Sequence, residues 1–198
     1  MNFSHKNVLV FSVLIILCCG CSSAARADTV SFTGTRTNQT PPAMTGGRCA
    51  PALTVSINPG LGTSVGTSNF GTFTSTQSHC IPNPPPGDFY DGLFTWTFAT
   101  GDTLTGTYFG SLTASGTPGV FNNTENYAVT GGTGFFAGAT GNVLGLGTLT
   151  FIPGSFPRAD VNLSGTITTV PEPTTMFLLG TGLTAIATKV RRRRKTSL

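Results

Sequence analysis

The chain has 198 residues, of which 26 are glycine and only 9% are charged. This length allows one modest domain once segments at both ends are set aside, and the scarcity of strong helix formers in the interior excludes a helical bundle. The formal net charge of +4 does not indicate a nucleic-acid partner, because residues 28–188 hold three arginines against all seven acidic residues of the chain.

The first segment is typical of a secretory signal. Lys6 precedes an apolar run at residues 8–17, and Ala25 and Ala27 follow in the A-x-A arrangement that signal peptidase cleaves. A run of about ten apolar residues is too short to remain as a membrane span. We predict a signal peptide over residues 1–27, removed after Ala27. The alternative is a lipoprotein that begins at Cys21, although a cysteine rather than a branched aliphatic residue stands three positions earlier.

Removal of the signal leaves two cysteines, Cys49 and Cys80, in a compartment that permits oxidation. We predict a disulfide between them, which would stabilise the fold by about 3 to 4 kcal/mol on the chain-entropy model. Spacing alone leaves open that both are free buried thiols.

Residues 28–169 are predicted to form strands and turns. Large residues alternate with small polar ones in segments 94–98, 144–151 and 161–167, as they do in half-buried strands. Glycine, proline, asparagine and aspartate punctuate the chain at 58–60, 84–88, 100–102, 131–132 and 141–142. Short strands at this spacing favour a small antiparallel β-barrel in a mainly β protein, with a sandwich as the alternative.

The segment 128–141, AVTGGTGFFAGATG, is the most characteristic of the body. It is similar to the GGTG-x-F-x-x-A-x-G signature of plant dirigent proteins and the related allene oxide cyclase barrels. In those families the signature lies on adjoining strands of a small antiparallel barrel and on their turn, so the resemblance implies a barrel here. No residue matches the catalytic or binding positions of either family, so their chemistry is not implied.

Three other motifs are interpreted as incidental. The glycines of segment 131–137 resemble a dinucleotide fingerprint without its helix, and segment 62–66 resembles a serine-hydrolase elbow without the sharp strand-to-helix turn. Segment 160–165 spaces oxygen ligands as calcium loops do, but Pro171 stands where the closing glutamate belongs. We therefore expect no catalytic residue, no metal site and no cofactor.

The chain ends in three consecutive elements. Pro171, Glu172 and Pro173 end the body, because a proline has no amide donor for a strand. Residues 174–190 contain one charge, Lys189, and reach the lower length limit of a transmembrane helix. A basic cluster that stays in the cytoplasm follows, which places the body outside: Arg191, Arg192, Arg193, Arg194 and Lys195. The alternatives are a nucleic-acid tail or a buried C-terminal helix.

These elements, in this order over residues 170–198, resemble the PEP-CTERM sorting tail of Gram-negative bacteria. The resemblance implies that an exosortase, a membrane-embedded enzyme with a catalytic cysteine, cuts the chain near the Pro-Glu-Pro. Signal peptidase and exosortase are then the expected processing partners. The chain would be held transiently at the inner membrane and then reach the cell surface or the medium.

Three functions are compatible with this sequence. The first is a noncatalytic surface or extracellular-matrix protein, and the second is a barrel that binds a small apolar or aromatic ligand. Candidate lining residues for such a ligand are Phe94, Trp96, Phe98 and Tyr108. The third is a barrel isomerase, which needs a polar group at the cavity floor. A lined cavity of about 300 Å³ or more would favour binding, and a packed interior would favour display.

Overall fold

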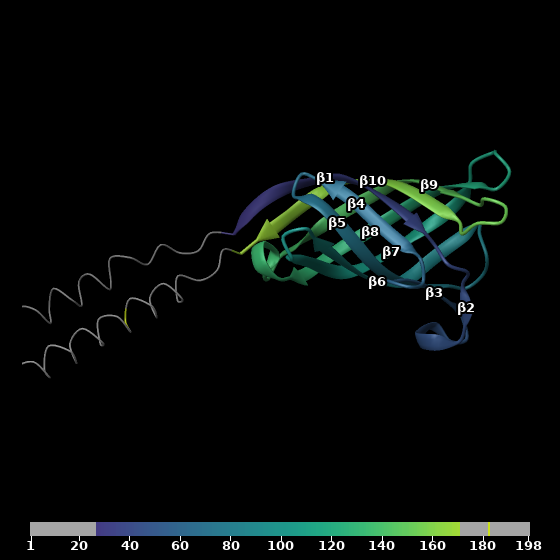
Figure 1. Cartoon of the computed structure of the whole chain (residues 1–198), viewed down its shortest axis with the longest axis horizontal. Coiled ribbons are helices and arrows are strands. Elements are labelled where there is room, and N and C mark those ends of the chain that lie inside the picture. The colour runs from purple at the N-terminus through teal and green to yellow at the C-terminus, as the bar shows by residue number, and fades with distance from the viewer. Residues whose placement is uncertain (1–26, 171–181, 183–198) are drawn as a thin grey trace, which may run out of the picture. The chain divides into compact units, whose positions relative to one another are not determined.

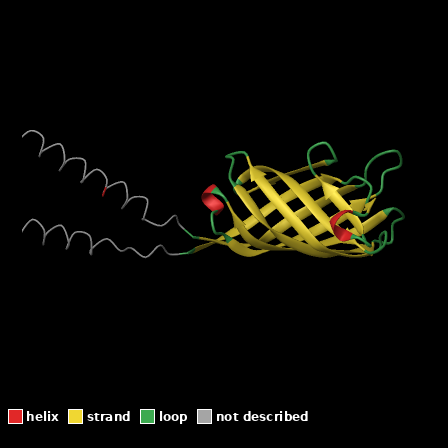
Figure 2. Cartoon of the chain, turned by 90° about the horizontal axis from the view of Figure 1, so that it is seen from below, coloured by secondary structure: helices red, strands yellow, loops and turns green. Residues whose placement is uncertain are grey.

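The computed structural model describes residues 27–170 and residue 182. Ten antiparallel strands form one sheet, and eight of them close into a barrel (Figure 1, Figure 2). Residues 27–170 belong to one compact unit. The strands are β1 (Asp28–Gln39), β2 (Met44–Thr45), β3 (Leu53–Ile57), β4 (Thr63–Ser68), β5 (Gly71–Ile81), β6 (Gly87–Phe98), β7 (Thr103–Ala114), β8 (Val120–Gly132), β9 (Thr140–Thr150) and β10 (Arg158–Thr169). Two short 3-10 helices, η1 (Gly47–Cys49) and η2 (Gly134–Phe136), complete the described elements.

The ring contains eight strands, in the order β1, β10, β9, β8, β7, β6, β5, β4, and it closes where β4 pairs with β1. Beyond the end of β4, strand β5 pairs with β3 instead, and β3 pairs in turn with β2. These two short strands therefore extend the sheet past β4 and β1. Pro41 and Pro42 follow the end of β1, where a strand would need amide donors that proline lacks. The predicted barrel is therefore confirmed.

The two ends of the barrel differ in the loops that they carry. Asp28 of β1 pairs with Thr169 of β10, so both ends of the folded unit leave from one pole, which we call the terminal pole (Figure 1). It carries loops 69–70, 99–102 and 133–139. The opposite end, the mouth pole, carries loops 40–43, 58–62, 82–86, 115–119 and 151–157 and the β2–β3 connection 46–52, which includes η1.

Aromatic side chains fill the half of the barrel interior nearer the terminal pole. Phe94, Trp96 and Phe98 point inward from β6 while Thr95 and Thr97 point outward, as predicted. Trp96 is fully enclosed, with its ring centroid 5.1 Å from that of Phe32. Further inward residues are Phe73, Leu104, Phe136, Val161, Leu163 and Ile167.

One predicted face was wrong. Leu144 and Leu146 were expected to repeat the inward pattern, but they are 38% and 49% exposed on the outside of β9. The inward positions belong to Val143, Gly145 and Leu149. A side chain at Gly145 would lie 2.8 Å from a methyl of Val161, so the inward face needs a glycine that gives no hydrophobic signal.

The GGTG segment lies on β8, on β9 and on the turn that joins them, as the resemblance implied. Phe136 of η2 closes the core at the terminal pole, with its ring 4.8 Å from that of Phe98. Gly134 has φ +57, and a side chain there would overlap the carboxylate of Asp102, so this position requires glycine. The calcium-like segment 160–165 belongs to β10.

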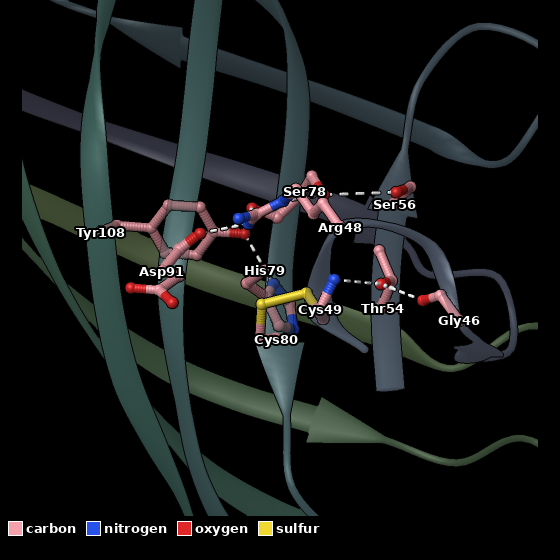
Figure 3. The surroundings of a disulfide bond; sticks show 10 residues. All are labelled: Gly46, Arg48, Cys49, Thr54, Ser56, Ser78, His79, Cys80, Asp91 and Tyr108. Atoms are coloured by element: carbon pink, nitrogen blue, oxygen red, sulfur yellow. Dashed lines mark hydrogen bonds between the residues drawn. A yellow bond between two sulfur atoms is a disulfide. The ribbon is translucent and has the colours of Figure 1, made fainter. Parts of the chain in front are cut away.

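The predicted disulfide between Cys49 and Cys80 is present, with the two Cα atoms 5.4 Å apart (Figure 3). Arg48, beside it on η1, donates a 2.8 Å hydrogen bond to the Ser78 carbonyl and another to the Asp91 carbonyl. These bonds fasten η1 across β5 and β6.

Several predictions fall outside the residues that the structure describes. They are the signal peptide before residue 27 with Ala25, the sorting residues Pro171, Glu172 and Pro173, the apolar segment 174–190, and the basic cluster 191–195. Ala27 lies directly before β1. In the described part of the chain, no helix combines the length and hydropathy that a membrane crossing requires.

Candidate ligand cavity

A cavity of about 340 Å³ lies at the mouth pole. Its walls are largely apolar and come from β3, β5, β6, β7, β9 and β10, and include Val55, Ile57, Ile81, Phe89, Leu112, Leu149 and Ala159. Small-molecule sites occupy roughly 300 to 1,000 Å³. Because a cavity of about 150 Å³ holds one benzene molecule, this one has room for a compact molecule of about two rings.

Polar side chains line the deeper part of this cavity. They come from four strands and comprise Asn38 of β1, Gln77 and His79 of β5, Tyr108 of β7, and Asn123 and Glu125 of β8. Asn123 and Glu125 share the inward face of β8 with Tyr127, as period-two alternation requires. The cavity therefore has apolar walls and a hydrogen-bonding floor.

A buried ion pair anchors this floor. Arg36 donates from Nη2 to both carboxylate oxygens of Glu125, at 2.9 and 2.7 Å, and from Nη1 to the hydroxyl of Tyr127. Tyr127 in turn donates to Glu125 Oε2 at 2.6 Å. Burial alone would lower the pKa of Arg36, but the Glu125 carboxylate and Tyr127 raise it above its usual value, so the guanidinium stays charged. The pair leaves the floor with no net charge of its own.

Amide side chains extend the network across the barrel. Gln77 donates a 3.1 Å hydrogen bond from its amide nitrogen to the Tyr127 hydroxyl. Its amide oxygen accepts a 2.9 Å hydrogen bond from Asn38. The amide oxygen of Asn38 accepts one from the Ser64 hydroxyl. These bonds connect β1, β4, β5 and β8 beneath the cavity. A network in which each member holds the next fixes the floor in one arrangement.

His79 and Tyr108 meet at the cavity wall, with 2.6 Å between the imidazole Nδ1 and the phenol oxygen (Figure 3). Burial lowers the pKa of His79 to about 4, with Arg36 and Arg48 adding to the effect and Glu125 opposing it. Burial also raises the pKa of Tyr108 above its usual value. Both groups are neutral near pH 7, and we assign the phenol as the donor to Nδ1.

Asn123 leaves one buried acceptor without a partner. Its Nδ2 donates to Glu125 Oε1 at 3.0 Å, which fixes the orientation of the amide, since a carboxylate only accepts. The carbonyl Oδ1 is buried and has no hydrogen-bond partner among the residues described. An unpaired buried acceptor costs about 1 to 3 kcal/mol, which a ligand donor or a water molecule at the floor would offset.

Glycines and bulges in the wall position Tyr108. A Cβ at Gly92 would lie 2.4 Å from Tyr108 Cδ1, so the ring occupies space that only glycine leaves. The β6–β7 register shifts between Phe89 and Gly92, where Asp91 adopts φ +51, and the β5–β6 register shifts beside His79. Bulges re-aim side chains in this manner.

The structure gathers a different set of residues at the cavity from the set that was predicted. Of the four candidate lining residues, Tyr108 lines the cavity. Phe94, Trp96 and Phe98 do not line this cavity and lie in the aromatic core, so their role as lining residues stays a prediction. Sequence reasoning missed Asn123, Glu125 and the other polar residues of the floor. The signal available was Asn123, Glu125 and Tyr127 at alternate positions of one predicted strand.

The residues described contain no group of three or more His, Cys, Asp or Glu side chains arranged to hold a metal ion. Fold and cavity together define a closed antiparallel β-barrel with a polar-floored, ligand-sized cavity at one end.

Comparison with known proteins identifies the sorting motif at the end of the chain. The PEP-CTERM protein-sorting motif matches residues 169–194, so the chain carries the sorting motif that the sequence predicted. That motif implies export, anchoring in the membrane and sorting by an exosortase.

A solved structure of the pterocarpan synthase dirigent protein GePTS1 is similar to this chain, with a TM-score of 0.47 and 12% identity over 73% of this chain and 89% of the other. This likeness concerns the fold alone. No curated protein matches the chain.

Proposed function

We propose that this exported, exosortase-sorted protein is a noncatalytic binding module that holds a small, mostly apolar molecule in the mouth cavity. The observation that carries the proposal is the cavity of about 340 Å³, with apolar walls and a fixed polar floor. A protein whose barrel serves only for surface display has no need of such a space. The protein acts after export, at the cell surface or in the medium.

The electrostatics of the floor support binding over acid–base catalysis. Efficient general acids and bases have pKa values near the working pH. Here burial lowers the pKa of His79 to about 4 and raises the pKa of Tyr108 further above neutral pH. The Glu125 carboxylate accepts hydrogen bonds from Arg36. The floor has the polar groups that an isomerase would need, but their protonation states suit hydrogen bonding to a ligand.

A cavity-filling substitution tests the binding function. Ala159 is buried on β10 and lines the cavity, whereas Asn162 lies exposed on the opposite face of the same strand. The neutral apolar dye N-phenylnaphthylamine should bind the wild-type barrel with a rise in fluorescence. The change Ala159→Phe should weaken binding by about tenfold or more, because it occupies the space, and Asn162→Phe should leave it unchanged. Equal dye binding by Ala159→Phe, or none by the wild type, would contradict the proposal.

Sorting is tested separately in cells with and without the exosortase. Mass spectrometry of both ends of the surface product should show a chain that begins near residue 28 and lacks the basic cluster. Persistence of Arg194 in the exposed product would rule out C-terminal processing.

A further inference from the structure

Five of the six connections at the mouth pole have an unusual composition, while the sixth, 46–52, carries Arg48, which is bonded to β5 and β6. None of the residues in loops 40–43, 58–62, 82–86, 115–119 and 151–157 is charged, although Arg158 directly follows the last of them and Asp88 lies two positions after loop 82–86. Ten of the thirteen prolines of the chain lie in these loops. The loops of the terminal pole contain no proline, and one of them includes Asp102. The composition therefore belongs to one end of the barrel.

Large apolar side chains project from these loops into solvent. Phe151, Ile152 and Phe156 are all more than 40% exposed on the single loop 151–157. Leu61 is similarly exposed on loop 58–62, which reaches Pro41 of the neighbouring loop. Phe151 and Pro157 also line the cavity. The apolar projections thus stand around the opening of an apolar cavity.

Four of the seven residues of loop 151–157 present no free backbone N–H. Its two prolines have no N–H, the Phe151 amide donates to the Gly119 carbonyl at 2.8 Å, and the Ser155 amide donates to the Ile152 carbonyl at 3.1 Å. The Pro157 carbonyl accepts from Thr40 at 2.9 Å. The amides of Ile152, Gly154 and Phe156 have no hydrogen-bond partner among the described residues, so they need the water and headgroup acceptors of the interface and exclude burial of this loop in the hydrocarbon core.

These features favour a lipid surface over a protein partner. Protein interfaces carry about one hydrogen bond per 100 to 200 Å² and are enriched in arginine, which these loops lack. The uncharged loops match a zwitterionic bilayer in charge, and the sorting motif implies that the chain meets a membrane, although that motif follows β10 at the opposite, terminal pole. A bilayer is therefore a partner that this protein meets.

We propose that the mouth pole inserts its uncharged loops, foremost loop 151–157, into the interface of a lipid bilayer. Entry of a ligand into the cavity from the lipid rests on the proposed function. The insertion itself is inferred from the loops alone.

The unit for the test is residues 28–170. These residues hold the aromatic core and close on themselves through β1 and β10, and they lack the apolar ends of the precursor. Cooperative urea unfolding checks the fold of this fragment, and the full chain serves as a second preparation. The reporter is Phe156→Trp, with Phe135→Trp at the terminal pole as the matched control, since these two phenylalanines are 45% and 53% exposed. The native Trp96 is fully buried and supplies a constant background.

With phosphatidylcholine vesicles, the emission of Phe156→Trp should shift to the blue, and lipids with brominated acyl chains should quench it. Phe135→Trp should show neither change. Replacing Ile152 with serine should weaken vesicle partitioning by about tenfold, because a large apolar side chain is removed from the inserted loop. Phe135→Ser should not alter partitioning, and added salt should have no effect because no charge takes part.

Four results would overturn the insertion: no partitioning of the wild type, equal quenching at both reporters, binding confined to anionic vesicles, or self-association through the mouth pole without vesicle binding. The Ala159→Phe variant separates the two proposals. If it loses dye binding but still inserts, both proposals stand. If the wild type inserts but binds no dye, only the proposed function fails.

Discussion

Removal of the positive charge from the cavity floor provides the sharpest test of the structure. Arg36 is almost completely buried on β1 and donates three hydrogen bonds, two to Glu125 and one to Tyr127. The change Arg36→Met keeps the length and most of the packing of the side chain, but it leaves the Glu125 carboxylate enclosed without its counterion.

The expected loss is large relative to the stability of a small domain. Each hydrogen bond to a charged group contributes about 1.5 to 3 kcal/mol, but bonds within one network do not add. Breaking one side of a buried ion pair costs about 3 to 5 kcal/mol. Since domains are stable by only about 5 to 15 kcal/mol, Arg36→Met should remove a large share of the unfolding free energy, measured by urea denaturation monitored through Trp96.

Two further variants control this experiment. Arg36→Met combined with Glu125→Met removes both charges and should be more stable than Arg36→Met alone, because no uncompensated charge stays buried. Arg158→Met breaks the solvent-exposed pair with Asp160 and should change stability little. A loss for Arg36→Met of less than about 1 kcal/mol, or a double variant no more stable than the single one, would refute the assignment of a buried, charged pair.

Three other predictions concern His79, the disulfide and Gly92. Since the pKa of His79 falls to about 4 in the fold, the unfolded chain binds more protons between pH 6.5 and 4, and the unfolding free energy should fall by at most about 3 kcal/mol as pH drops through that window; His79→Gln should flatten this dependence, and an unchanged slope would contradict the burial. Replacing Cys49 and Cys80 with serine should lower stability by about 3 to 4 kcal/mol in urea, because the crosslink closes a loop with a sequence separation of 31; a loss near zero would mean that the crosslink does not restrict the unfolded chain. Gly92→Ala should cost about 1 to 3 kcal/mol and weaken dye binding, because the new methyl overlaps Tyr108; wild-type behaviour in both assays would show that the ring is not confined there.

The sequence predicted the barrel because its signals are local. Alternation at Phe94, Trp96 and Phe98 reports a strand directly, and the glycine-rich segment 128–141 reports the turn between two adjoining strands. The cavity depends instead on which strands become neighbours. Arg36 and Glu125 are 89 residues apart in the chain, and the sequence around either residue gives no signal that the two will pair.

The same limit explains why three of the four candidate lining residues lie away from this cavity. Aromatic residues in a strand can fill a core or surround a ligand, and the pattern is identical in both cases. The closure of the barrel decides between the two, because it packs Trp96 against Phe32 of β1 and leaves the cavity at the other end of the barrel. At Gly145, the inward residue has no side chain, so hydrophobicity pointed to the wrong face of β9.

The pairing of the first strand with the last determines when this protein can fold. Thr29 and Thr168, hydrogen-bonded at 2.9 Å, are separated by 139 positions. Contacts at such separation form slowly, because a long loop must be closed before they stabilise anything. In a chain that crosses a membrane unfolded, β1 emerges before β10, and one edge of β1 stays uncovered until β10 has crossed. The chain is most susceptible to aggregation and proteolysis between the emergence of β1 and that of β10. The length of this interval depends on the rate of export.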